Sequence, residues 1–196
     1  ANFDYGLLGS GVSQAVAPAK PRFDESKVAQ MINKRQQQPS QQGELFSFNV
    51  YFQPNQKAFS TSLYKDAFSR VTELASTYGG AIISIEGNSD PMAYLRARKE
   101  GAPPMVLGQI KQSARNLSLA RAQEVRDSVI RQAASQSISL DPSQFAVTGN
   151  GIASPATGMC GAVPCAPATE QEWRSNMRVV FRIIQVEAEA DVFKPL

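Results

Sequence analysis

Two stretches of the sequence decide the fold: residues 81–90, which read AIISIEGNSD, and residues 117–125, which read LSLARAQEV. The first is rich in β-branched residues, which predicts a strand followed by a turn that ends on Asp90. The second lies within residues 116–134, where apolar residues recur with the spacing of one helix face. These apolar residues are Leu119, Ala122, Val125, Val129 and Ala133. A strand and a long helix are therefore expected here.

The same patterns extend in both directions along the chain. Residues 44–52 and 145–148 and a last segment, 177–186, have strand composition, and residues 60–78 have helical spacing. The element order is β-α-β-α-β-β, with an insert before the second main helix. Strands that alternate with helices predict an α/β (α+β) two-layer sandwich, with a mixed sheet and the helices on one side.

The ends of the chain differ in composition from its centre. Residues 1–43 contain scattered Gly and Pro and a Gln-rich run, which predicts a flexible tether or linker with a short helix over residues 25–35. We place the folded domain at residues 44–187 and a C-terminal tail at residues 188–196. Because the chain begins at Ala1 without a signal sequence, we expect a mature chain or a piece of a longer one.

The insert, residues 91–115, is strongly basic. Its Pro and Gly residues predict an irregular segment that interrupts any long helix. It carries a net charge of +4 from Arg96, Arg98, Lys99, Lys111 and Arg115 against Glu100. A solvated surface explains this charge, and attraction of an anionic polymer such as a glycan strand or teichoic acid is the alternative.

The composition excludes several classes of function. The chain has no His and only two Cys, so it has no His general base, His metal ligand or four-ligand Cys zinc site. Its net charge of +3 is too small to predict nucleic-acid binding. No apolar run approaches the roughly 20 residues of a membrane helix. We therefore expect neither an enzyme nor a nucleic-acid-binding or membrane-spanning chain, and we expect no metal or cofactor.

Both cysteines, Cys160 and Cys165, lie in a loop over residues 150–175. Their spacing is wider than the Cys-x-x-Cys of redox enzymes, and two Cys alone make a poor metal site. We predict a disulfide that orders this loop, in an oxidising compartment. Trp173, which follows the cysteines, is expected to pack on the sheet.

Four patches resemble, in order, the OmpA-like (OmpA/MotB C-terminal) peptidoglycan-binding domain. Residues 50–55 look like its first strand and turn, and residues 83–90 look like its strand that ends in Gly-His-Thr-Asp. Residues 117–125 match its Leu-Ser-x-x-Arg-Ala-x-x-Val helix, and residues 176–179 look like its closing Asn-Arg-Arg-Val. The resemblance covers about residues 44–186.

The resemblance implies non-catalytic binding of the diaminopimelate in peptidoglycan stem peptides, in the periplasm or cell envelope of a Gram-negative-type bacterium. By matching position, Asp90 would bind the ligand ammonium and Arg121 its carboxylate, and a helix N-terminus near Arg121 would favour the carboxylate. Four further residues complete the implied ligand-binding set: Asn55, Asn88, Asn116 and Arg178.

The sequence departs from the family pattern in four places. Asn88 and Ser89 replace the His-Thr pair, Ala114 replaces an Asn, and Met177 replaces the first closing Arg. Thirty residues separate Asp90 from Arg121, about twice the usual number, so the insert either roofs or blocks the pocket.

Other interpretations of these residues remain open. Asp90 also suits a simple turn before Pro91, and Arg121 could pair internally with Asp90. The domain could be a protein–protein interaction module that has lost peptidoglycan binding. The insert and the Cys loop also resemble OmpA-like domains fused to transport-type periplasmic binding proteins, which would make the chain the C-terminal part of a larger protein.

Overall fold

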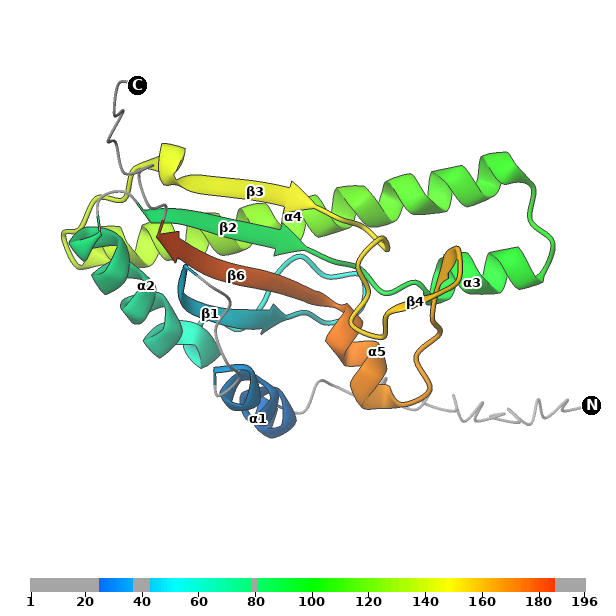
Figure 1. Cartoon of the computed structure of the whole chain (residues 1–196), viewed down its shortest axis with the longest axis horizontal. Coiled ribbons are helices and arrows are strands. Elements are labelled where there is room, and N and C mark those ends of the chain that lie inside the picture. Colours follow the sequence, from blue (N-terminus) through cyan, green and yellow to red (C-terminus); the bar gives the residue numbers. More distant parts are fainter. Residues whose placement is uncertain (1–24, 37–42, 79–80, 186–196) are drawn as a thin grey trace, which may run out of the picture.

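A four-stranded mixed sheet forms the centre of the computed structural model, which describes residues 25–36, 43–78 and 81–185 (Figure 1). Its strands are β1 (Glu44–Tyr51), β2 (Ala81–Gly87), β3 (Phe145–Gly149) and β6 (Arg178–Gln185). They lie in the order β1-β6-β2-β3. β6 is antiparallel to β1 and β2, whereas β2 and β3 are parallel, so the sheet is mixed as predicted.

One face of the sheet carries the hydrophobic core, because alternate residues of a strand point to the same side. In β6 these residues are Val179, Phe181 and Ile183, and each is 0% exposed. Phe48 of β1 lies opposite Phe181 in the register, and the two rings stack with centroids 4.8 Å apart. The sequence pattern of β6 thus translates directly into a buried face.

Two helices cover this face. They are α2 (Lys65–Thr77), which follows a short 3-10 helix η1 (Thr61–Tyr64), and α4 (Pro104–Ser135). Both contribute buried side chains to the same core as the strands, and they contact each other. Together η1 and α2 occupy the segment predicted as one helix over residues 60–78. The prediction of a two-layer sandwich with the main helices on one side is confirmed.

α4 is longer than the sequence pattern indicated. We expected a helix over residues 116–134, but it begins at Pro104 and has 32 residues. Proline suits the first turn of a helix, where its missing N–H would have no partner. Gly108, which we expected to break the helix, is accommodated within it at a cost of about 1 kcal/mol relative to Ala. The predicted irregularity of residues 91–115 is therefore wrong.

The insert is an antiparallel pair of helices beyond the end of the sheet (Figure 1). α3 (Met92–Lys99) is followed by a short turn and then by the first part of α4. The two helices are in contact, and α4 extends beyond the end of the sheet (Figure 1). The insert therefore continues the helical layer past the strand ends.

The segment between β3 and β6 also contains structure where we predicted a loop. β4 (Met159–Cys160) and β5 (Val163–Pro164) pair as a small hairpin, and α5 (Glu170–Asn176) follows. α5 begins with a capping box. The Thr169 hydroxyl accepts from the Glu172 N–H, and the Glu172 carboxylate accepts from the Thr169 N–H. This reciprocal pair defines where α5 starts.

The N-terminal region contributes one described helix, α1 (Glu25–Gln36). It contacts β1, and its Val28 and Ile32 are buried in the core cluster. Residues 1–24 and 37–42 of the predicted tether, and the predicted tail 188–196, lie outside the described residues. Among those that the structure describes, no helix is long and apolar enough to cross a membrane.

α4 lies very close to the sheet at Gly87, the last residue of β2. A Cβ atom at Gly87 would lie 1.8 Å from the Ser118 carbonyl oxygen, so this contact requires glycine. The Ser118 hydroxyl accepts a hydrogen bond from the Gly151 N–H (2.8 Å), and the Ser89 hydroxyl donates to the Ala114 carbonyl (2.9 Å). The chain leaving β2 and β3 is thereby tied to the middle of α4.

Candidate functional site

Asp90 lies in the loop that leaves β2, just before α3. Its Oδ2 accepts a hydrogen bond from the Met92 backbone N–H (2.8 Å), and its Oδ1 accepts one from the Asn176 side-chain amide (3.1 Å). Burial raises the pKa of Asp90, while these hydrogen bonds and the charges of Arg96 and Arg121 act to lower it. Asp90 is therefore a half-buried acid with two donors aimed at its ionised form.

Arg121 lies in the interior of α4 and is 1% exposed. Its Nε donates to the Gln56 carbonyl (2.8 Å), its Nη1 to the Asn88 carbonyl (3.1 Å) and its Nη2 to the Gln53 carbonyl (3.1 Å). The guanidinium carbon also lies 5.1 Å from the centroid of the Phe52 ring. These contacts from the end of β1, its following turn and the end of β2 hold the guanidinium in one orientation.

The positive charge of Arg121 is not neutralised by a carboxylate in contact with it, within the part of the chain that the structure describes. Burial lowers the pKa of Arg121 to about 10, and the charge of Asp90 acts to raise it. The group therefore stays protonated at neutral pH. A guanidinium has five N–H groups, so the three bonds to carbonyls leave donors for a further acceptor.

Asp90 and Arg121 line the same pocket, which has a volume of about 480 Å³. Asn55, which has a positive φ of 59°, lines it from the turn after β1. Tyr94 of α3 and Ser113 of α4 line it from the insert. The insert therefore forms a wall of the pocket. A carboxylate and a guanidinium in one pocket can bind a ligand that carries both an ammonium and a carboxylate.

The structure brings Asp90, Arg121 and Asn55 together, but three other predicted ligand residues do not line this pocket. Asn88 is 1% exposed and supports Arg121 through its backbone carbonyl. Asn116 is exposed and accepts a hydrogen bond from Gln112. Arg178 donates to the carbonyls of Ser154 and Ser175. Asn88 thus acts on the pocket indirectly, and Asn116 and Arg178 are engaged elsewhere.

We predicted that a helix N-terminus near Arg121 would favour the ligand carboxylate, and this prediction is wrong. That prediction placed Arg121 in the first turns of its helix, but α4 begins at Pro104. The field of a helix end acts mainly within the first turn, and Arg121 lies more than four turns further along the helix. Any carboxylate at Arg121 is therefore bound by the side chain without a contribution from the end of α4.

Sequence reasoning missed several residues that line the pocket or contact its lining, and these lie on α3 and α5. Trp173 of α5, which we expected to pack on the sheet, lines the pocket. Asn176, one turn later in α5, is 0% exposed and donates to Asp90. Lys111 lies above the ring of Tyr94, with its Nζ 5.0 Å from the ring centroid. The only available signal was the position of Asn176 in the closing motif, and it did not reveal the contact.

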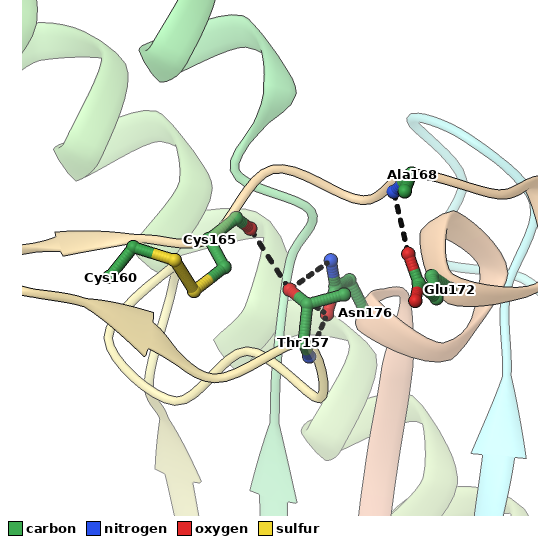
Figure 2. The surroundings of a disulfide bond; sticks show 6 residues. All are labelled: Thr157, Cys160, Cys165, Ala168, Glu172 and Asn176. Carbon is green, nitrogen blue, oxygen red and sulfur yellow. Dashed lines mark hydrogen bonds between the residues drawn. A yellow bond between two sulfur atoms is a disulfide. The ribbon is translucent and has the colours of Figure 1, made fainter.

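The two cysteines form the predicted disulfide. Cys160 ends β4 and Cys165 directly follows β5, and their Cα atoms are 4.8 Å apart. Figure 2 shows that this disulfide lies next to Thr157 and Asn176, which are joined by hydrogen bonds. The disulfide hairpin is therefore a neighbour of the pocket as well as a constraint on the loop.

Known structures match this chain in fold, at low sequence identity. No protein-family model and no curated protein matches the sequence. The periplasmic domain of Helicobacter pylori MotB (residues 90–256) matches with a TM-score of 0.51 and 14% identity, over 81% of this chain and 86% of that chain. The peptidoglycan-associated lipoprotein of Burkholderia pseudomallei matches with a TM-score of 0.48 and 16% identity, over 69% and 88%.

A third match is the OmpA-like domain of FopA1 from Francisella tularensis, with a TM-score of 0.45 and 15% identity, over 69% of this chain and 70% of that chain. At such identities a likeness shows the fold alone. The MotB match and the β1-β6-β2-β3 mixed sheet confirm the fold expected from the sequence motifs. The chain has the fold of OmpA-like domains, with a helical insert that forms a wall of its charged pocket.

Proposed function

We propose that this domain binds peptidoglycan through the diaminopimelate of the stem peptide, without covalent chemistry, and anchors a larger envelope protein to the cell wall. The observation that carries the proposal is that Asp90 and Arg121 line one pocket. Both stand at positions where the sequence resembles the ligand-binding residues of OmpA-like domains. The likeness to a periplasmic domain of MotB supports a periplasmic location.

The chemistry of the ligand suits the two charges. The side chain of diaminopimelate ends in an ammonium and a carboxylate on one carbon. Asp90 would accept hydrogen bonds from the ammonium, and the remaining N–H groups of Arg121 would donate to the carboxylate. Because Arg121 is already held by three carbonyls, little further ordering of its side chain accompanies binding.

This mechanism predicts discrimination between cell-wall types. Lysine at the same peptide position has the ammonium but lacks the carboxylate, so the contact with Arg121 would be lost. A hydrogen bond to a charged group contributes about 1.5–3 kcal/mol, which corresponds to a loss of roughly ten- to a hundredfold in affinity. We therefore expect retention by diaminopimelate-type peptidoglycan and much weaker retention by Lys-type peptidoglycan.

The test is calorimetric titration of the protein with a diaminopimelate-containing stem peptide and with its Lys analogue. Asp90→Asn removes the carboxylate charge, and Arg121→Lys keeps a positive charge but loses the planar fork. Asp66→Asn and Arg131→Lys are matched controls, because both residues are exposed and neither lines the pocket. We expect binding in the native protein and both controls, and its loss in the two pocket variants.

Equal affinity for the two peptides would contradict the role of Arg121. Absence of heat in folded native protein, at millimolar peptide, would contradict the proposal as a whole. Folding of each variant is checked by circular dichroism and thermal unfolding, since Arg121 also supports the fold.

One observation favours a second candidate function. Arg121 is 1% exposed and bonded to three backbone carbonyls, which is also what a purely structural arginine would show. In that case the domain would be a protein–protein interaction module that kept the fold and lost the ligand. A stable partner complex together with no response to either stem peptide would support this second function.

A further inference from the structure

The disulfide hairpin and Asp90 are joined by a short series of hydrogen bonds. Thr157 lies between them, and its hydroxyl contacts the Cys165 carbonyl (3.0 Å) (Figure 2). The Asn176 amide contacts Thr157 on one side and Asp90 on the other. Three segments that are distant in the sequence therefore meet at the acid side of the pocket.

The hydrogen-bond pattern determines which end of the Asn176 amide faces Asp90. The Thr157 backbone N–H donates to Asn176 Oδ1 (3.2 Å), because an N–H can only donate. This orients Nδ2, with its two N–H groups, toward Asp90 Oδ1 (3.1 Å) and Thr157 Oγ1 (3.2 Å). The reverse orientation would place a carbonyl oxygen against the carboxylate.

The Thr157 hydroxyl has one proton, and the Cys165 carbonyl accepts it. The same oxygen is then free to accept from Asn176 Nδ2. Cys165 is itself held by the disulfide to Cys160 and by its N–H, which donates to the Gly158 carbonyl (2.9 Å). The position of one carbonyl in the hairpin therefore supports the orientation of Thr157 and, through it, of Asn176.

We infer that Asn176 is a positioning residue for Asp90, and that the Cys160–Cys165 disulfide maintains this role through Thr157. The inference concerns the acid that the proposed function uses, and it rests on that function only for its consequence for ligand affinity. Asn176 is 0% exposed, so solvent does not substitute for its N–H donor in the native state. Without the disulfide, the Cys165 carbonyl loses its covalent constraint and the alignment of the three groups relaxes.

The cations near Asp90 are unaffected by this change. Arg96 of α3 and Arg121 of α4 both favour the ionised carboxylate, as does the Met92 N–H at the start of α3. None of them is bonded to the hairpin or to Thr157 in the described part of the chain. Loss of the Asn176 donor would therefore raise the pKa of Asp90 while the other stabilising groups stay in place.

The test is a carbon-detected NMR titration of the Asp side-chain carboxyls in the ligand-free domain. It compares the oxidised protein, the Cys160→Ser/Cys165→Ser variant, and protein treated with dithiothreitol. In the last sample two electrons and two protons pass from the dithiol to the S–S bond, which yields two Cys thiols and the cyclic disulfide of the reagent. We expect the pKa of Asp90 to rise in both altered proteins.

Thr157→Val separates the proposed path from a general loosening of the loop. It removes the hydroxyl but keeps the backbone N–H and a similar shape. We expect it to raise the pKa of Asp90 in the oxidised protein, and we expect reduction to cause little further change in this variant. Thr148→Val is the matched control, because Thr148 is exposed on β3 and away from the pocket.

The same proteins are then titrated with the diaminopimelate stem peptide, for which we expect about a tenfold loss of affinity on reduction. An unchanged pKa of Asp90 in the reduced protein and in Thr157→Val would overturn the inference. A raised pKa with no peptide binding in any state would uphold the inference and refute the proposed function. Peptide binding together with an Asp90 pKa that does not change on reduction would refute the inference and support the proposed function.

Discussion

The two halves of α4 have opposite surroundings, although they form one continuous helix. Val125, Val129 and Ala133 in the C-terminal half are 0% exposed against the sheet, whereas Met105 in the N-terminal half is 76% exposed. The N-terminal half extends past the strand ends beside α3 and forms a wall of the pocket (Figure 1). The packed half (residues 120–135) thus supports the fold and contributes Arg121 to the site, whereas the projecting half (residues 104–119) forms a wall of the pocket.

The contact between β2 and the middle of α4 is where we expect the largest effect of a small change. Gly87→Ala would place a methyl group 1.8 Å from the Ser118 carbonyl oxygen, in a contact between two backbones. We expect a loss of about 3 kcal/mol or more, the upper end of what overpacking costs. Chemical denaturation measures this loss, and native stability in the variant would contradict the close approach of α4.

A pair of truncations sharpens the comparison between the two halves. Val129→Ala removes buried methyl groups from the packed half, and we expect a loss of about 2 kcal/mol from reduced burial and the cavity left behind. Met105→Ala removes a side chain that is mostly in solvent, and we expect a change below about 0.5 kcal/mol. Equal losses of unfolding free energy would show that the halves do not differ as described.

In the projecting half, one substitution should raise the free energy of unfolding instead of lowering it. A Cβ at Gly108 would meet no atom within 4 Å, and the residue lies inside the helix. Gly108→Ala should therefore stabilise the protein by about 0.5–1 kcal/mol through helix propensity. A higher melting temperature with unchanged ligand affinity is the expected result, and destabilisation would indicate a hidden contact at this turn.

The smallest effect that we expect is a dependence of the free energy of unfolding on pH. It arises from Asp90 in the pocket. Because the folded protein raises the pKa of Asp90, it binds more protons than the unfolded chain between the two pKa values. The free energy of unfolding should then fall as pH rises from about 4, the pKa of an unfolded Asp, through the raised pKa. Asp90→Asn should lack this slope, whereas ligand affinity in the native protein should rise over the same range.

Much of the fold was predictable because burial leaves a periodic trace in the sequence. In the strand over residues 81–86 the core-facing residues alternate along the chain. In the helix over residues 116–134 the core-facing apolar residues recur with helical spacing. The N-terminal half of α4 also has apolar residues at helical spacing, but Val106, Ile110 and Ala114 line the pocket and were not recognised as part of a helix. Pro104 and Gly108 then suggested a break where the backbone in fact continues as a helix.

The candidate site was predictable only where a motif marked it. Asp90, Arg121 and Asn55 were named from the resemblance, and all three line the pocket. Trp173, which lines the pocket, and Asn176, which donates to Asp90, were not anticipated, because their segment has no periodicity and sequence spacing reveals none of its contacts. The bond from Asn176 to Asp90 joins residues 86 positions apart.

The sequence alone was enough to predict the order of the four sheet strands and the two main helices, the buried side of each, and the two charges that the resemblance points to. These features depend on local spacing and on residue type. The three-dimensional packing was needed to show that carbonyls from the turn after β1 and the end of β2 hold Arg121, and that the insert forms a wall of the pocket. The physical reason is that a pocket forms where segments distant in sequence pack together, and their contacts depend on chain geometry.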